Sequence, residues 1–284
     1  MHHKCRDFRG VFVIAALALP ALLGACPQPK GDPAKSAKRL DIAKDALSRG
    51  DLDTADAEAN KALAFQQTNE EAYNVRGLVH VVRAAAKQRL LEVEDCLTGV
   101  DAEAMRVDLD AELAAADKDF AKASQLAPDF GEAWANRGVV ANLQDEPGKA
   151  IEYLTTALDH PSRLVDAALT RAHLGWAQFA KGDHVQAAKE LLQSLQFHPG
   201  MCVATYRLGR VYFAREEWEK AAEQFQGVTD QAPCGSQEAS LYLMKARIAQ
   251  GLLEEARAAR DACIQMAPRS CIAAQCRTEG SDLP

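Results

Sequence analysis

One spacing constrains this sequence more than any other feature, because it recurs along most of the chain at intervals of about 34 residues. Residues 168–201 carry its clearest form, with Gly175, Gly182, Ala187 and Pro199 at the positions that define the unit. Small side chains at Gly175 and Ala187 let two antiparallel helices pack closely, and Gly182 and Pro199 end the two helices. A helix pair of this kind cannot bury its apolar face alone, so such units must stack.

This pattern is typical of tetratricopeptide (TPR) repeats, and it predicts an all-α, right-handed superhelical solenoid with a concave binding surface. Alternating runs of Val, Ile and Thr are absent, which argues against a β-sheet. We expect about six helix pairs in an array over residues 36–269, followed by a C-terminal cap and tail over residues 270–284. The units span residues 36–69, 70–130, 131–164, 168–201, 202–235 and 237–269.

The second unit is longer than the others, because its closing residues arrive about 27 positions later than the repeat demands. The inserted residues have a helical composition on both sides of residues 97–101. We therefore expect each helix to be lengthened by roughly 13 residues, so that the hairpin protrudes about 20 Å. Leucine and valine residues supply an apolar stripe on each arm, and a disordered acidic loop is the alternative. Such a hairpin is a candidate docking element for a partner.

The N-terminal segment has the features of an export signal. A basic start leads into an apolar run from Val11 to Ala25, which is shorter than the roughly 20 residues of a membrane-spanning helix. The run ends in the letters LGAC, which resemble a bacterial lipobox and imply that Cys26 becomes the lipidated first residue. An ordinary cleaved signal and an uncleaved anchor are the alternatives. We expect a lipoprotein signal peptide over residues 1–25 and a lipidated flexible tether over residues 26–35.

The charge of the chain argues against one class of partner. The 284 residues include 33 basic and 40 acidic side chains, a net charge of −7. Removal of residues 1–25 takes away three basic side chains and one acidic side chain, which leaves 30 against 39 and a net charge near −9. A chain this acidic disfavours nucleic acid as a partner.

Six cysteines follow the lipobox, in a chain expected to reach a compartment where disulfides form. Cys202 and Cys234 lie at the two ends of one antiparallel hairpin, so we expect a disulfide worth about 3–4 kcal/mol there, with two free thiols as the alternative. Cys263 can pair with Cys276 or with Cys271 to hold the C-terminal cap. Cys96 is left without a predicted partner. No Cys or His pairs have the spacing of a zinc site, so we expect no bound metal.

No motif of enzyme chemistry is present. The sequence contains no GxSxG, HExxH or GxxxxGK pattern. The histidines are scattered over different units, where they are expected to be surface or helix-end residues: His80, His160, His173, His184 and His198. We therefore expect no catalytic residue, no cofactor and no small-molecule substrate.

The candidate binding surface is the concave face, which the first helix of each TPR pair lines mainly through positions 2, 5, 9 and 12 of the unit. In units four to six these positions form a strip of aromatic, aliphatic and cationic side chains. The candidate partner-binding residues are Leu169, Trp176, Phe179, Tyr206, Arg210, Phe213, Leu241 and Lys245. Packing between helices is the alternative for Phe179 and Phe213, whereas an exposed patch of Trp, Tyr and Arg is typical of a protein-binding surface.

A lipobox followed by about six TPR units resembles the outer-membrane lipoproteins of the Tgl and PilF/PilW type, which act as pilotins for type IV pilus secretins. The similarity is closest over residues 134–233, which contain a displaced fourth unit and a well-formed fifth. Residue 27 is Pro, not the Asp of enterobacterial lipoproteins retained in the inner membrane, which favours the periplasmic face of the outer membrane. The resemblance implies a lipid-anchored scaffold that helps a secretin assemble during pilus biogenesis, twitching or gliding motility. An adaptor for peptidoglycan hydrolases or synthases, or for another envelope complex, is the alternative.

Overall fold

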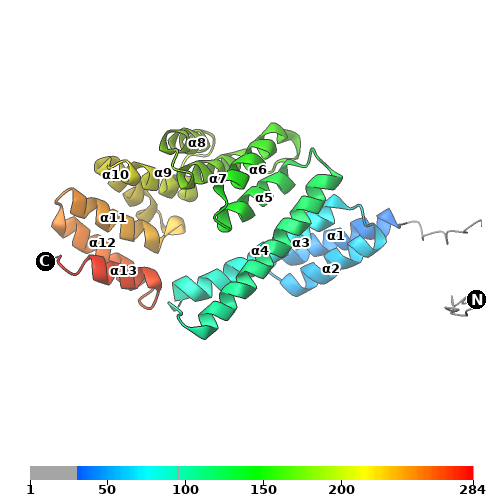
Figure 1. The fold of residues 1–284 in the computed structure, drawn as a ribbon, viewed down its shortest axis with the longest axis horizontal. Helices are drawn as coiled ribbons and strands as arrows, with labels where there is room; N and C mark the ends of the chain where they lie inside the picture. The colour runs from blue at the N-terminus through cyan, green and yellow to red at the C-terminus, as the bar shows by residue number, and fades with distance from the viewer. Residues whose placement is uncertain (1–30, 95, 284) are drawn as a thin grey trace, which may run out of the picture. The chain divides into compact units, whose positions relative to one another are not determined.

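The computed structural model describes residues 31–94 and 96–283. The predicted signal peptide, Cys26 and the first residues of the predicted tether lie outside this part of the chain. The described residues are helical from one end to the other and contain no β-strand (Figure 1). None of the described helices combines the length and the apolar character needed to cross a membrane.

The helices form six antiparallel pairs and a short final helix. In chain order they are α1 (Pro33–Ser48), α2 (Leu52–Phe65), α3 (Glu70–Arg89), α4 (Val100–Leu126), α5 (Gly131–Leu143), α6 (Pro147–Asp159), α7 (Ala167–Ala180), α8 (His184–Phe197), α9 (Cys202–Ala214), α10 (Trp218–Thr229), α11 (Gln237–Ala249), α12 (Leu253–Met266) and α13 (Cys271–Glu279). One π-helical turn, η1 (Leu90–Glu94), follows α3, and 3₁₀ turns lie at η2 (Pro161–Arg163) and η3 (Ala232–Cys234). The predicted TPR solenoid is confirmed, although α1 begins at Pro33, within the predicted tether.

The helix pairs pack closely because a glycine of the first helix lies against a large side chain of the second. A Cβ atom added at Gly209 would lie 2.7 Å from the ring of Phe225, and one added at Gly175 would lie 2.7 Å from Leu191. Phe225 and Leu191 are fully buried. The large side chains of the second helices therefore occupy the space that the glycines leave open. In the last pair Met244 replaces this glycine and is itself fully buried.

The turn between the two helices of a pair has the same backbone conformation in five units. Its φ angle is positive, between 56° and 88°, at Gly50, Asp145, Gly182, Glu216 and Gly251. Glycine adopts this left-handed conformation without steric cost, whereas Asp and Glu do not. The turn is therefore imposed by the helix pair even where the local sequence opposes it.

The second pair is an extended helical hairpin, as the sequence predicts. α4 has 27 residues, and α3 and η1 together cover residues 70–94. Leu91 and Leu113 are 3% and 2% exposed, and Leu113 belongs to a buried cluster with Ala84 and Phe120. The apolar stripes of the two arms therefore pack against each other, which excludes a disordered loop for the described residues.

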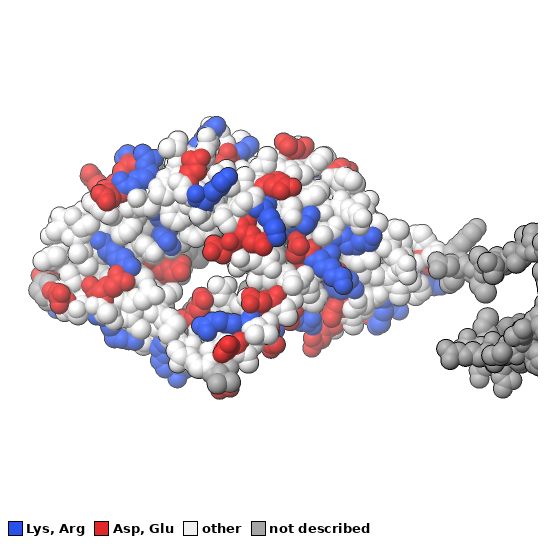
Figure 2. Space-filling view, in the orientation of Figure 1, with Lys and Arg blue, Asp and Glu red and all other residues white. Residues whose placement is uncertain are grey.

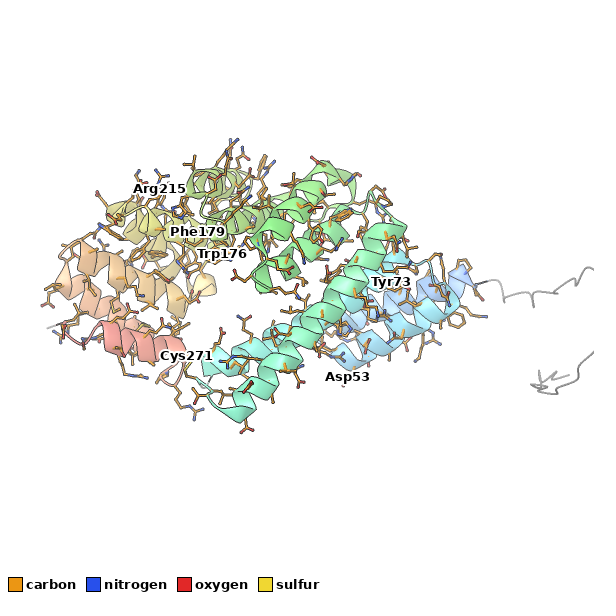
Figure 3. All side chains as sticks on the ribbon, in the orientation of Figure 1. Asp53, Tyr73, Trp176, Phe179, Arg215 and Cys271 are labelled. Carbon is orange, nitrogen blue, oxygen red and sulfur yellow. A yellow bond between two sulfur atoms is a disulfide. The ribbon has the colours of Figure 1, made fainter. Side chains whose placement is uncertain are left out.

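The tip of this hairpin is joined covalently to the C-terminal helix. Cys96 forms a disulfide with Cys271, 175 residues further along the chain. The Cys96 amide also donates a hydrogen bond of 3.1 Å to the carbonyl oxygen of Arg269. Figure 1 shows the helix pairs following an arc that brings α13 back to the hairpin, and Figure 3 labels Cys271 at this junction. We call this bond the Cys96–Cys271 clasp.

The clasp corrects the prediction that Cys96 has no partner, because the curvature that joins these residues is a property of the whole array. Two other disulfides lie closer in sequence, Cys202–Cys234 and Cys263–Cys276. The first has the predicted partners, and the second resolves the alternative left open for Cys263.

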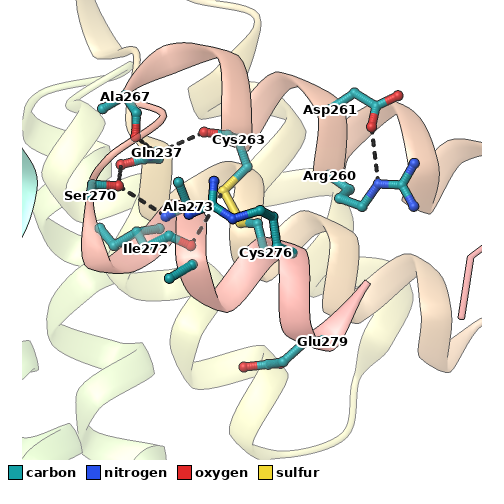
Figure 4. Close-up of a disulfide and its surroundings, with 12 residues drawn as sticks. Gln237, Arg260, Asp261, Cys263, Ala267, Ser270, Ile272, Ala273, Cys276 and Glu279 are labelled. Carbon is teal, nitrogen blue, oxygen red and sulfur yellow. Dashed lines mark hydrogen bonds and ion pairs between the residues drawn. A yellow bond between two sulfur atoms is a disulfide. The ribbon is translucent and has the colours of Figure 1, made fainter. Parts of the chain in front are cut away.

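The Cys263–Cys276 disulfide lies in a hydrogen-bonded junction between the last unit and α13 (Figure 4). The side-chain amide of Gln237 donates to the carbonyl oxygen of Cys263 at 2.7 Å, and the hydroxyl of Ser270 donates to Gln237 Oε1 at 2.7 Å. Ser270 Oγ also accepts from the amide of Ala273 at the start of α13, at 2.9 Å. This network fixes α13 as the cap of the array.

Candidate functional site

The first helices of units four to six, α7, α9 and α11, carry the candidate binding residues. Figure 3 shows Trp176 and Phe179 on the side of α7 that faces the interior of the arc. In the space-filling view this face of residues 31–283 is hollowed between the later helix pairs and the α3–α4 hairpin (Figure 2). Basic and acidic side chains are interspersed over the rest of the face shown, without one dominant charged patch.

A single guanidinium lies at the centre of the candidate site. The Arg210 Cζ atom is 4.0 Å from the ring centroid of Tyr242, 5.5 Å from that of Trp176, 5.7 Å from that of Phe179 and 5.9 Å from that of Tyr206. Arg210 Nη1 also donates a hydrogen bond of 2.9 Å to the Tyr206 hydroxyl. A cation close to several aromatic rings is stabilised by their quadrupoles. We call these five residues the arginine–aromatic cluster.

The rings of the cluster also contact one another. Trp176 and Phe179 stack with their centroids 5.1 Å apart, and Tyr206 meets Tyr242 edge to face at 6.5 Å. Together with the contacts of Arg210 to Trp176 and Phe179, they join α7, α9 and α11 across two repeat boundaries. The cluster is therefore a rigid platform made by three consecutive units, and no single unit contains it.

The remaining predicted residues divide between surface and core. Leu169 is 36% exposed at the start of α7, and the Lys245 ammonium forms an ion pair of 2.9 Å with Glu279 of α13. Phe213 packs edge to face against Trp218 and Tyr242, at 5.0 and 5.3 Å, which is the packing alternative left open for it.

The prediction that Leu241 contacts a partner is wrong, because this side chain is only 3% exposed within the core of the last units. Position 5 of the unit points towards the second helix here. Position 6 lies on the inner face instead, since it is four residues after position 2 and three before position 9. It holds Tyr242 in unit six, and it holds Arg207 and His173 in units five and four. Helical periodicity counted from position 2 is the signal that would have found these residues.

His173 and Arg207 form a largely buried pair beside the cluster. Arg207 Nη1 lies 3.3 Å from His173 Nδ1, and the Arg207 guanidinium is 5.5 Å from the Trp176 ring. Burial, together with the neighbouring guanidinium, lowers the pKa of His173 to about 3. His173 is therefore neutral at pH 7, and its Nδ1 atom can accept a hydrogen bond from Arg207.

Burial also changes the acid–base properties of the other two polar groups. It lowers the pKa of Arg207 to about 10. It raises the pKa of the Tyr206 phenol, in part because the Glu238 carboxylate lies nearby. Arg207 is still a cation and Tyr206 a neutral phenol at pH 7, so the site presents positive charge and hydrogen-bond donors.

A cavity of about 770 Å³ adjoins the clasp. Side chains from both sides of the junction line it, among them Arg89 of α3, Arg106 of α4, Glu238 of α11 and Gln275 of α13. Within residues 31–94 and 96–283, no group of three or more His, Cys, Asp or Glu side chains is placed to hold a metal ion. The site therefore has the means to bind a partner and shows no arrangement for metal chemistry in the described residues.

Sequence comparison matches the chain to no protein family and to no curated protein. Structure comparison does find similar folds. The crystal structure of PilW, described as a widely conserved type IV pilus biogenesis factor, is similar with a TM-score of 0.64 and 20% identity, over 84% of this chain and 96% of that one. PilF of Pseudomonas aeruginosa is similar with a TM-score of 0.63 and 14% identity, over 87% of this chain and 98% of that one.

The same fold also occurs in a different kind of assembly. A chain in the Cut9–Hcn1 hetero-tetramer of the APC/C is similar with a TM-score of 0.54 and 19% identity, over 86% of this chain and 48% of that one. At these identities the comparisons establish a TPR fold. The binding partner has to be argued from the site.

Proposed function

We propose that this chain is a lipid-anchored periplasmic TPR scaffold that helps an outer-membrane secretin of type IV pili to assemble. The observation that carries the proposal is the arginine–aromatic cluster on the inner side of an array similar in fold to PilW and PilF over most of its length. Clusters of Tyr, Trp and Arg are the residues that most often dominate protein–protein binding.

The proposed mechanism is shielding of an unassembled subunit. Acyl chains on Cys26 would hold the protein at the periplasmic face of the outer membrane. The inner surface of the array would then bind a segment of a secretin subunit, until oligomerisation buries that segment. Disulfides at three places in the described chain support an oxidising compartment such as the periplasm. In this proposal the protein acts by binding and carries out no catalysis.

The test is the abundance of heat-resistant secretin multimers in outer membranes, measured by immunoblot. Cells without this protein should retain secretin monomers and lose multimers. The Cys26→Ala variant should lose multimers because the scaffold is released from the membrane. Replacement of Trp176 and Arg210 by Ala should have the same effect while the protein remains folded and abundant.

The matched control is Arg215→Gln. Arg215 follows α9 and is ion-paired with Glu217 at 2.7 Å, and Figure 3 shows it apart from Trp176 and Phe179. This variant should keep normal multimers. Normal levels of secretin multimers in cells without the protein would contradict the proposal. A cell-shape defect in those cells, with co-purification of cell-wall enzymes, would then favour an adaptor for peptidoglycan hydrolases or synthases.

A further inference from the structure

Two cations of the candidate site have no anionic partner. In the described part of the chain, neither Arg207 nor Arg210 forms an ion pair with a carboxylate. Arg210 donates one hydrogen bond to the neutral Tyr206 hydroxyl, and Arg207 contacts the neutral His173 ring. A guanidinium has five N–H donors, and each of these two contacts occupies one of them.

This situation differs from that of arginines on the first helices of other units. Arg76 of α3 contacts Asp119 at 2.6 Å, Arg137 of α5 contacts Asp117 at 3.1 Å, and Arg171 of α7 contacts Glu190 at 2.7 Å. The chain is acidic, with 40 acidic against 33 basic residues, so carboxylates for pairing are abundant. The lack of an ion pair at Arg207 and Arg210 is therefore a local property of the candidate site, where the Glu238 carboxylate lies beside the Tyr206 phenol.

The surroundings of these two arginines make an incoming carboxylate favourable. Both guanidiniums lie 5.5 Å from the ring of Trp176, and both residues belong to α9. Burial disfavours the charge of Arg207, which is why its pKa falls. An anion bound beside a desolvated cation recovers that cost, and the planar guanidinium matches a carboxylate with two parallel hydrogen bonds.

We propose that Arg207 and Arg210 bind side-chain carboxylates of an extended acidic segment of the protein partner, with apolar side chains of that segment against Trp176 and Tyr242. This inference rests on the proposed role of the cluster as the partner-binding surface. It adds the chemistry of the partner, namely Asp or Glu alternating with apolar residues.

The test is fluorescence anisotropy with full-length protein purified in a mild detergent. The probe is a short fluorescein-labelled peptide in which Asp and Glu alternate with Leu and Phe. Two matched peptides carry Asn and Gln, or Lys, in place of the acidic residues. Wild-type protein should bind the acidic peptide at least about tenfold more tightly than the amide peptide, because a guanidinium forms stronger hydrogen bonds with a carboxylate than with a neutral amide. This preference should weaken as salt is added.

The variants separate the cluster from general charge effects. Arg210→Gln and Arg207→Gln should each weaken binding of the acidic peptide about tenfold and leave the amide peptide unchanged. Arg210→Glu should transfer the preference to the Lys peptide. Arg215→Gln removes the same charge outside the cluster and should bind like wild type. Circular dichroism confirms that each variant keeps its helices.

The proposal is overturned if the acidic and amide peptides bind equally, if neither binds, or if Arg210→Gln binds the acidic peptide as wild type does. Preferential binding of anionic phosphatidylglycerol vesicles through the same arginines would also overturn it. Its failure can be told apart from failure of the proposed function. A preference for the acidic peptide, together with normal secretin multimers in cells lacking the protein, would support the proposed partner chemistry and exclude the secretin as the partner. Loss of multimers without a preference for the acidic peptide would support the role in secretin assembly and exclude the proposed partner chemistry.

Discussion

The first three units and the last three differ in their disulfides and in the surroundings of some arginines on their first helices. In units one to three, arginines of the first helices are paired with carboxylates, as in the contacts of Arg76 with Asp119 and of Arg137 with Asp117. In units five and six, Arg207 and Arg210 lie against aromatic rings, and two disulfides close the helix pair and the cap. The second region also has ion pairs, such as that of Arg171 with Glu190. It is distinguished by its two disulfides and by Arg207 and Arg210, which form no ion pair.

This difference separates arginines that stabilise the array from the arginines that we propose bind a partner. A neutralised arginine between helices has little left to offer a partner, whereas an arginine stacked on rings keeps its donors. Loss of the first kind should therefore destabilise the protein, and loss of the second kind should mainly weaken binding. Stability and binding measurements on single variants test this division.

The largest effect on stability is expected from the clasp that joins the two regions. Replacing Cys96 and Cys271 by Ala should lower the free energy of unfolding by about 5 kcal/mol, because loop entropy rises with the 175-residue separation. Removing Cys263–Cys276, with a separation of 13 residues, should cost only about 3 kcal/mol. Urea unfolding followed by circular dichroism measures both values. Equal losses would show that loop length does not govern these bonds.

The next effect distinguishes the two kinds of arginine. Asp119→Ala should cost about 3 kcal/mol, since the Asp119 side chain is only 6% exposed and its removal leaves Arg76 without its carboxylate. Arg210→Gln should cost less, about 1–2 kcal/mol, because it removes one hydrogen bond to a neutral group and the cation–π contacts but leaves no carboxylate without its ion-pair partner. Chemical unfolding of both variants checks the contrast. Comparable losses would contradict the division between structural and binding arginines.

A pH-dependent effect on stability is expected from His173 in the second region. The folded-state pKa of about 3 lies below the ordinary value of 6.5, so the unfolded chain takes up a proton between these values while the folded chain does not. Stability should therefore fall as pH drops below 6.5. By pH 5 the loss of unfolding free energy due to His173 should reach about 1–2 kcal/mol. This loss should disappear in His173→Gln, whose side-chain oxygen can still accept a hydrogen bond from Arg207.

The measurement for His173 is the difference in unfolding free energy between pH 7 and pH 5, for wild type and variant. Carboxylates elsewhere contribute equally to both proteins, so the comparison isolates the imidazole. His198→Gln, at an exposed histidine, is the matched control. An identical pH dependence in His173→Gln and wild type would rule out a buried neutral imidazole.

The smallest predicted change in the free energy of unfolding should be similar in both regions. Asp145 of unit three and Glu216 of unit five occupy the left-handed turn position where three other units have glycine. Asp145→Gly and Glu216→Gly should each raise the free energy of unfolding by about 0.5–1 kcal/mol, because glycine removes the steric cost of the positive φ angle. The reciprocal change Gly182→Asp should lower it by a similar amount. Thermal unfolding of the three variants provides the test.

Most of the fold could be predicted from the sequence because the repeat imposes local rules. Small residues such as Gly175 and Gly209, the turn at Gly182 and the apolar stripes of the second unit each act within one helix pair. The Cys202–Cys234 bond is equally local, since it joins the ends of one pair. The clasp could not be predicted, because its partners meet only through the accumulated curvature of several units.

The position of the candidate site on the first helices could be predicted from the sequence, whereas the residues that form it could be predicted only in part. Trp176, Tyr206 and Arg210 follow from the positions that line a TPR groove. Leu241 was assigned to the wrong side, and Tyr242, its neighbour, is the ring nearest to the Arg210 guanidinium. A single step along a helix rotates a side chain by about 100°, so a small error in phase exchanges core and surface. The lack of ion pairs at Arg207 and Arg210 also depends on neighbouring helices, which the sequence does not reveal.

The Cys96–Cys271 clasp also constrains the order in which the cysteines of the chain are oxidised. Synthesis delivers the N-terminal cysteines first, so Cys96 is present long before Cys271, and Cys202 is the next cysteine to follow it. Pairing in order of appearance would join Cys96 to Cys202, whereas the native bonds are Cys96–Cys271 and Cys202–Cys234. Six cysteines allow 15 connectivities, and this one requires non-consecutive pairing. The repeats must therefore stack before Cys96 is oxidised, or a thiol–disulfide exchange catalyst must correct the early bond.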